Sequence, residues 1–369
     1  MISRREFLLK AGTAVSLTGA GALAGCTARE ASSGFAAPQP FFLTRGAVLV
    51  VKDMETYDWA RLAKEAGLTT LATHIRPSEI AAFVRTEAGQ RFLSDCRQRG
   101  IHVEHELHAL GDLLPRSLFD KDPAMFRMNE KGQRVRDSNL CVHSTSALNL
   151  VAENAARYTR LLPSTTARYF YWIDDASPMC RCPECRGFSD SDQALWLENH
   201  LLRAIRQVDP RTTLAHLAYA STIEPPTQVK PDMGIFLEFA PIERRYDTPL
   251  SRREAKTVTG GLMHGRLLDA LDANLAWFGR QGAQVLEYWL DVSRFSGWNR
   301  AKTLEIPWSD AVFHADLATY AQRGIRHVTT FAAWLDGDYA KRWGVAPVRA
   351  YGAGLNCWKW LDGKAMEEI

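Results

Sequence analysis

Residues 169–175 read Tyr-Phe-Tyr-Trp-Ile-Asp-Asp, a continuous apolar run that ends in two carboxylates. Continuous rather than alternating hydrophobicity is typical of a strand covered on both faces, as in a parallel sheet. Carboxylates at the carboxyl end of such a strand are well placed for acid/base chemistry. The structural alternative is that Asp174 caps the next turn and that Asp175 pairs with an arginine.

Runs of the same kind recur along the chain, with amphipathic helical patterns between them. The expected strands are residues 47–51, 69–75, 102–107, 169–173, 213–219, 234–239, 284–290 and 327–334. The expected helices are residues 59–66, 78–99, 148–162, 191–208, 267–279 and 309–323. Eight strands with intervening helices predict an α/β fold, a (β/α)8 TIM-type barrel that forms one domain over residues 44–369.

The first residues carry an export signal. Residues 3–8 read Ser-Arg-Arg-Glu-Phe-Leu, a twin-arginine signature that leads into a weakly apolar run. That run is too short and too rich in Gly and Ala to span a membrane. Residues 23–26 read Leu-Ala-Gly-Cys and resemble the lipobox of bacterial lipoproteins. The sequence therefore predicts a twin-arginine signal peptide over residues 1–25 and lipidation of Cys26.

A small, polar segment over residues 26–43 is expected to be the lipidated start of the mature chain and a flexible tether. Thr27, rather than Asp, follows Cys26 and favours the outer membrane of a Gram-negative cell. We therefore expect a lipoprotein that is exported by the twin-arginine pathway and anchored to a membrane in the periplasm. The alternative is cleavage near Ala37 with loss of Cys26.

The composition fits a globular, carbohydrate-handling protein. Hydrophobic residues make up 46% of the chain and charged residues 24%, and the formal charge is only +3. Nothing in this balance indicates a nucleic-acid partner. Eleven Trp and ten Tyr suit a carbohydrate partner, although most such rings belong to the core. We expect a monomer that acts on a carbohydrate.

Polar and aromatic residues follow the predicted strands at their carboxyl ends, where a barrel gathers them into one pocket. For each aromatic residue the alternative is core packing, and Trp298 is a further candidate for stacking on a sugar. The candidate substrate-binding residues are His74, Arg76, Tyr219, Glu238, Glu287, Trp289 and Trp334.

Several motifs give the chain a family resemblance. These are Trp172 through the Cys-x-Cys-x-x-Cys motif, Ser191-Asp192-Gln193, Asn199, Leu217-Ala218-Tyr219, Glu224-Pro225-Pro226, Lys230-Pro231 and Asn139-Leu140-Cys141. Together they resemble the DUF4838 family over roughly residues 46–360. That family is grouped with glycoside hydrolase family 163, whose members resemble endo-β-N-acetylglucosaminidases. Members often carry Asn-Asp where this chain has Asp174-Asp175, so the resemblance carries over most directly to Asp175.

Adjacent carboxyl groups suit the hydrolysis of a β-linked N-acetylhexosamine, in which the substrate's acetamido oxygen is the nucleophile. Asp175 is expected to be the general acid/base, and Asp174 is expected to hold the acetamido nitrogen. The Tyr288 hydroxyl, or second that of Tyr219, would bind the acetamido oxygen, and Glu287 is the reserve acid/base. The competing hypotheses are a barrel that binds glycans or cell-wall fragments without turnover, and an α-glucuronidase-like enzyme that uses Arg76 and Arg244.

The cysteine motif calls for a separate interpretation. Cys180, Cys182 and Cys185 have a spacing that matches tetrahedral zinc, and the family resemblance places Cys141 beside them. Exported proteins more often form disulfides, but a twin-arginine substrate folds before export and can be loaded with metal in the cytoplasm. Structural zinc and disulfides both stay open, whereas four cysteines leave no position for a catalytic zinc. No organic cofactor is expected.

Overall fold

The computed structural model of the chain describes residues 39–361 and 364–367. The predicted signal peptide, the lipidation of Cys26 and the tether up to residue 38 lie outside these ranges and stay predictions. Within them, no helix is both long enough and apolar enough to span a membrane.

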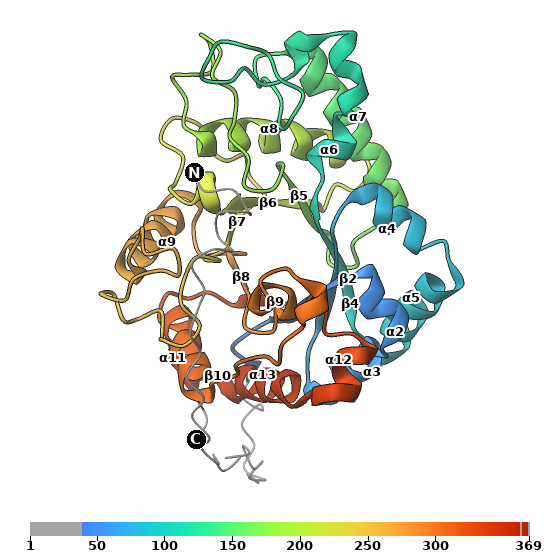
Figure 1. Ribbon diagram of the computed structural model, residues 1–369, viewed down its shortest axis with the longest axis vertical. Helices are drawn as coiled ribbons and strands as arrows, with labels where there is room; N and C mark the ends of the chain where they lie inside the picture. The colour runs from blue at the N-terminus through green and yellow to red at the C-terminus, as the bar shows by residue number, and fades with distance from the viewer. Residues whose placement is uncertain (1–38, 362–363, 368–369) are drawn as a thin grey trace.

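Eight parallel strands form a closed barrel in chain order, so the predicted (β/α)8 fold is confirmed. Each strand pairs with the next, and the last pairs with the first. Figure 1 shows the strands as a ring with the helices outside it. The barrel strands are β2 (Thr44–Val50), β3 (Thr70–His74), β4 (His102–His108), β5 (Arg168–Trp172), β6 (Thr213–Ala218), β7 (Ile235–Phe239), β8 (Gln284–Glu287) and β9 (His327–Phe331).

The predicted helices are present, but the expected helix over residues 78–99 is two helices. A Cβ at Gly89, in the first turn of the second helix, would lie 2.1 Å from the carbonyl oxygen of Phe83, so this close approach to the end of the first helix requires glycine. The Thr86 hydroxyl caps the second helix by accepting from the Gly89 N–H. The α-helices are α2 (Val51–Thr56), α3 (Trp59–Ala66), α4 (Pro77–Phe83), α5 (Glu87–Arg99), α6 (Leu110–Leu113), α7 (Thr145–Leu161), α8 (Asp190–Ile205), α9 (His264–Phe278), α10 (Val292–Phe295), α11 (Asp310–Ala321), α12 (Gly337–Trp343) and α13 (Ala346–Cys357). Short 3-10 turns are η1 (Arg116–Asp120), η2 (Pro123–Met125), η3 (Ala220–Thr222) and η4 (Arg300–Lys302).

A small antiparallel sheet outside the barrel brings the first and last described segments together. It contains β1 (Gln39–Pro40), β10 (Trp358–Leu361) and β11 (Lys364–Glu367), with β10 in the middle. Phe41 and Phe42 follow β1 and are fully buried beside Trp358. Residues 39–43 are therefore part of the fold, and the prediction that the tether extends to residue 43 is wrong for them.

Buried carboxyl groups fill the barrel below the carboxyl ends of its strands. Glu106 on β4 and Glu238 on β7 are fully buried, and both accept hydrogen bonds from the Gln284 side chain on β8. Burial raises the pKa of Glu238 to about 8. Burial, with repulsion from Glu238, raises the pKa of Glu106 well above its ordinary value. The folded barrel therefore holds protons that the unfolded chain releases.

This proton retention predicts the pH dependence of stability. A carboxyl group whose pKa is raised by folding stabilises the protein fully below its unfolded pKa, and that contribution is lost as the pH rises through the folded pKa. The free energy of unfolding should therefore fall between about pH 5 and pH 8 by up to about 1.4 kcal/mol per pH unit for each retained proton. Glu106→Gln should make this slope shallower, measured by chemical denaturation at several pH values. The exposed Glu153→Gln should leave the slope unchanged, and parallel curves for wild type and Glu106→Gln would contradict the interpretation.

Candidate active site

A cavity of about 290 Å³ lies at the carboxyl ends of the barrel strands, which is the predicted mouth. Its lining comes from the last residues of the strands and from the loops that follow them. The polar and aromatic lining residues are His74, His108, Trp172, Asp175, Tyr219, Tyr288, Asp291, Ser293, Trp298, Phe331 and Trp334. The structure thus brings together four of the predicted substrate or catalytic side chains around Asp175, namely His74, Tyr219, Tyr288 and Trp334.

Asp175 presents its carboxyl group to this cavity just beyond the end of β5, and its side chain is 27% exposed. The Tyr219 hydroxyl donates to Asp175 Oδ1 over 3.2 Å. His108 Nε2 lies 3.7 Å from the same oxygen. The carboxyl group is therefore partly desolvated and contacted by two groups that can hold or exchange a proton.

The second ring nitrogen of His108 fixes how the imidazole faces Asp175. Nδ1 lies 2.8 Å from the backbone carbonyl oxygen of Ile173, which can only accept, so Nδ1 carries a hydrogen. In the neutral ring, Nε2 then presents a lone pair toward Asp175. The imidazole is thus oriented with Nε2 toward the Asp175 carboxyl group, an arrangement that suits proton transfer once the two groups close from 3.7 Å to hydrogen-bond distance.

The floor and walls of the cavity are aromatic. Trp172 is buried below Asp175, and its indole N–H donates to Glu238 Oε2 over 2.8 Å. The imidazole of His108 packs edge-on against Trp172, with ring centroids 5.1 Å apart. Trp298 and Trp334 are half-buried in the wall. Flat apolar rings beside hydrogen-bonding groups match the two kinds of surface of a sugar ring.

Tyr288 and Asp291 lie on the β8 side of the cavity. Tyr288 stacks on Phe331, and burial raises the pKa of its hydroxyl well above the ordinary value, so the hydroxyl is a proton donor at neutral pH. Asp291 accepts from the Ser293 hydroxyl and from the backbone N–H of Arg294, and burial raises its pKa too. Asp291 is the second carboxyl group among the described residues that line the cavity.

Strained backbone conformations cluster at this mouth. Ala176 and Ala220 adopt φ values of 47° and 49°, directly after Asp175 and Tyr219. Trp298 and Trp334, at φ 54° and 71°, are also in the left-handed region that disfavours non-glycine residues. Such conformations persist where the surroundings hold them in place, and they are typical of functional sites.

The prediction that Asp174 holds the substrate beside Asp175 is not supported by its position. The Asp174 carboxylate forms an ion pair with Arg116 and accepts from the backbone N–H of Asn139. It is not among the residues that line the cavity. Consecutive side chains at a strand end point in opposite directions, and here Asp174 faces the long loop between β4 and α7.

Alternation also explains why Glu287 and Trp289 are not in the cavity. Leu286 and Tyr288 line the cavity, so the alternate positions Glu287 and Trp289 face the helices. Glu287 is fully buried there, with hydrogen bonds from Arg244, Tyr246 and Tyr320. The Trp289 indole donates to Asp316. Both residues belong to the layer between the barrel and α11, so their positions do not support the predicted sugar-binding roles.

Three other candidates lie outside the cavity lining. Arg76 is the exposed N-cap residue of α4. Arg244 is fully buried and pairs with Asp316 over 2.6 Å. Glu238 supports Trp172 from below without lining the cavity. The described lining residues include no Lys or Arg, so the cavity lacks the cation that an α-glucuronidase-like enzyme would need for a uronate.

The four predicted metal ligands form one buried group, which we call the thiol cluster. Its members are Cys141, Cys180, Cys182 and Cys185. All four are free thiols, and their sulfur atoms lie within 4.8 Å of one another. The cluster therefore has the composition and spacing of a metal site, and the disulfide alternative does not apply in this structure.

Sequence reasoning missed the roles of His108 and Asp291. The predicted strand over residues 102–107 ends just before His108, but no sequence pattern shows that its ring faces Asp175. The predicted strand over residues 284–290 overran β8 and stopped just before Asp291, which lies in the following loop and caps α10. A search for carboxyl groups shortly after strand ends would have found Asp291.

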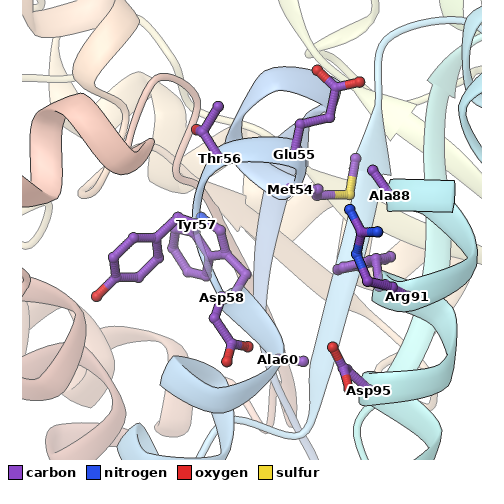
Figure 2. Close-up of a pocket in the computed structure, with 11 residues that line it drawn as sticks. Met54, Glu55, Thr56, Tyr57, Asp58, Ala60, Ala88, Arg91 and Asp95 are labelled. Atoms are coloured by element: carbon purple, nitrogen blue, oxygen red, sulfur yellow. The ribbon is translucent and has the colours of Figure 1, made fainter.

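A second depression, of about 310 Å³, lies on the outer helical layer of the barrel. Figure 2 shows Arg91 and Asp95 of α5 facing Met54 and Asp58 across it. Its lining comes from α2, α3, α5 and the link between the first two, and none of it belongs to a barrel strand. In a TIM barrel the chemistry belongs at the carboxyl ends of the strands, so this depression is not the candidate active site.

A family model described as a domain of unknown function (DUF4838) matches residues 60–263, more than half of the chain. The chain belongs to the DUF4838 family. The matched segment includes Asp175, Tyr219 and the whole thiol cluster. A comparison with curated proteins found no match.

Solved structures similar to this DUF4838 protein include glycoside hydrolases. A glycoside hydrolase family 20 β-N-acetylglucosaminidase is 11% identical, with 86% of this chain and 70% of that chain covered and a TM-score of 0.41. A family 5 xyloglucanase from Paenibacillus pabuli is 11% identical, with 85% and 99% covered and a TM-score of 0.45. ZgEngAGH5_4, in complex with a cellotriose, is 13% identical, with 85% and 96% covered and a TM-score of 0.46. Likenesses at these scores carry no information on substrate or mechanism.

The placement of Glu287 in this DUF4838 protein yields a stability prediction. Glu287→Gln breaks a buried charge pair with Arg244 and should destabilise the fold by about 3–5 kcal/mol. Asp175→Asn changes a partly exposed side chain and should lower the free energy of unfolding by less than about 1 kcal/mol. Denaturant unfolding of both variants measures the difference. If Asp175→Asn lowers the free energy of unfolding as much as Glu287→Gln does, or more, Asp175 is itself a structural carboxylate.

Proposed function

We propose that this protein is a glycoside hydrolase in which Asp175 is the general acid/base. The observation that carries the proposal is the carboxyl group of Asp175 in an aromatic cavity, contacted on one oxygen by Tyr219 and faced by His108. A glycosidic oxygen is a poor leaving group until it receives a proton, which a positioned carboxylic acid can supply. The aromatic walls provide surfaces on which a sugar ring can stack.

The finer proposal is a β-linked N-acetylhexosamine substrate, as the resemblance to glycoside hydrolase family 163 implies. The acetamido carbonyl oxygen attacks the anomeric carbon while the glycosidic C–O bond breaks and the Asp175 proton moves to the leaving oxygen. Water then attacks the anomeric carbon and returns a proton to Asp175, and the bond to the acetamido oxygen breaks. The Tyr288 hydroxyl, which lines the cavity, would donate to the acetamido oxygen.

We assign to Asp291 the role that the sequence had predicted for Asp174, because Asp291 lines the cavity and Asp174 does not. In the acetamido mechanism its carboxylate would accept from the acetamido nitrogen. A second candidate follows from the same observation, because two carboxyl groups on one cavity can also cleave plain glycosides by direct displacement. Asp291 would then be the nucleophile or the base, and the acetamido group would not be needed.

The cellular setting is a further part of the proposal. Twin-arginine export and a lipid anchor at Cys26 would place the hydrolase in the periplasm, with the outer membrane favoured, where exogenous or cell-wall glycans are present. If the purified protein binds N-acetylglucosamine oligomers but releases no sugar from them, it is a glycan-binding barrel and not a hydrolase.

Asp175→Asn is the direct test of the acid/base assignment. Turnover should fall about 10²-fold to 10⁴-fold on substrates with poor leaving groups, the usual contribution of general acid/base catalysis. The loss should shrink on aryl glycosides whose leaving group needs no proton. The exposed Asp338→Asn is the matched control and should be fully active. An Asp175→Asn variant with wild-type rates on a natural linkage would place the acid elsewhere.

Substrate pairs decide between the two mechanisms. A 4-nitrophenyl β-N-acetylglucosaminide should be hydrolysed, whereas the matching β-glucoside should not, because it lacks the internal nucleophile. Asp291→Asn should impair both steps of the acetamido reaction, with Asp338→Asn again as control. Hydrolysis of the plain glucoside at a comparable rate, lost on Asp291→Asn, would instead establish direct displacement.

A further inference from the structure

We propose that the thiol cluster binds one zinc ion and that this metal site holds the loop carrying Asp175 in its active position. The ion is structural, because four cysteine ligands leave no coordination position for a substrate. This inference rests on the proposed function in one respect, namely that Asp175 is the acid/base. Metal binding and loop order are measured independently of activity.

The sulfur geometry supports a shared ion. Cys141 Sγ lies 3.7 Å from the sulfur atoms of both Cys182 and Cys185. Tetrahedral zinc with Zn–S bonds of about 2.3 Å separates its sulfur ligands by about 3.8 Å. The four cysteines are 3% exposed or less, as expected for a closed tetrathiolate site that is shielded from water. Sulfur-only tetrahedral coordination selects zinc among the common divalent ions.

Hydrogen-bond donors surround Cys180 Sγ, and this is the second observation that supports a bound metal. The backbone N–H of Met128 donates to Cys180 Sγ over 3.2 Å, and that of Cys182 donates over 3.5 Å. An Arg134 guanidinium nitrogen lies 3.6 Å from the same sulfur. Neutral thiols are weak acceptors, whereas metal-bound thiolates are negatively charged and are commonly supported by such outer donors. The surroundings therefore fit thiolates better than four buried thiols.

The cluster joins two long loops at the mouth. Cys141 lies just before α7, and the other three cysteines lie between β5 and α8. Gln193 on α8 ties the second loop to the helix, because its amide group bonds to the backbone N–H and carbonyl of Cys180. An ion bound here cross-links segments about forty residues apart in the sequence, close to α7 and α8, which lie side by side in Figure 1.

Asn139 connects the metal site to Asp175. It lies two residues before Cys141 and holds the backbone at φ 49°. Its side-chain oxygen accepts from the Asp174 N–H over 3.0 Å, and its side-chain nitrogen donates to the carbonyl oxygens of Ser177 and Pro178 over 3.1 and 2.9 Å. These bonds bracket Asp175 on both sides. Whatever fixes Cys141 to the 180–185 segment therefore also fixes the turn that presents Asp175.

The first experiment measures metal on the intact, natively purified protein. Elemental analysis should find one zinc per chain. Cys182→Ser should lower this below about one fifth of the wild-type content, whereas Cys96→Ser, a buried thiol on α5 outside the cluster, should retain it. Wild-type protein that carries no metal and does not take up added Zn²⁺ or Co²⁺ with a thiolate charge-transfer band would overturn the proposal.

The second experiment tests positioning. Removal of zinc by a chelator should increase hydrogen exchange in residues 174–185 and lower turnover at least tenfold, with exchange of β2 and β9 unchanged and both effects reversed by Zn²⁺. Asn139→Ala should keep zinc but increase exchange in residues 174–178 and lower turnover. Exchange there that is unaffected by zinc removal and by Asn139→Ala would refute positioning. An ordered, zinc-loaded loop without hydrolysis would instead count against the proposed function.

Discussion

The pairing of β9 with β2 closes the barrel, and the candidate site depends on that closure. The two strands are the last and first of the ring, and five residue pairs join them in parallel register from Thr44 with His327 onward. Side-chain hydrogen bonds reinforce this pairing. The Tyr351 hydroxyl donates to the Gly46 carbonyl oxygen, and the Thr44 hydroxyl is hydrogen-bonded to His327 Nδ1. An open sheet would spread the strand ends along an edge. Closure instead brings the ends of β5 and β8, and with them Asp175 and Tyr288, to one cavity.

Alternation along each strand then sorts side chains between the cavity, the barrel interior and the helical layer. Trp172 shows how these layers connect, because its ring forms the cavity floor and its N–H reaches buried Glu238. Glu238 in turn shares Gln284 with Glu106. Burying carboxyl groups is unfavourable unless they are hydrogen-bonded or hold a proton. The polar interior thus lowers stability at high pH while it fixes the orientation of Trp172 under the site.

The periodic parts of the fold could be predicted from the sequence, and the loops could not. Continuous apolar runs located all eight strands because strands buried on both faces leave a strong signal. The same signal overran β8, since Tyr288, Trp289 and Leu290 are apolar after the strand has ended. A continuous apolar run also does not show which residues face the cavity, so Glu287 was assigned to the wrong face. Asp175 and the Cys-x-Cys-x-x-Cys motif were found from local spacing. The contacts of Asp174 with Arg116 and Asn139 join segments 35 or more residues apart, and no local pattern encodes them.

Hydrogen bonds hold strained residues in place on both sides of the mouth. A left-handed conformation costs a non-glycine residue about 1–2 kcal/mol, so each strained residue needs a fixed partner. On the β9 side, the two oxygens of the buried Asp53 carboxyl group accept from the N–H groups of Trp334 and Val50. On the β5 side, Asn139 brackets Asp175 and Ala176 through bonds to Asp174, Ser177 and Pro178. Each buried hydrogen bond contributes about 1 kcal/mol net, so two or three are enough to offset the strain at each side. Hydrogen bonds therefore hold Trp334 and Asp175 in position without a ligand, so binding energy in the cavity need not be spent on ordering them.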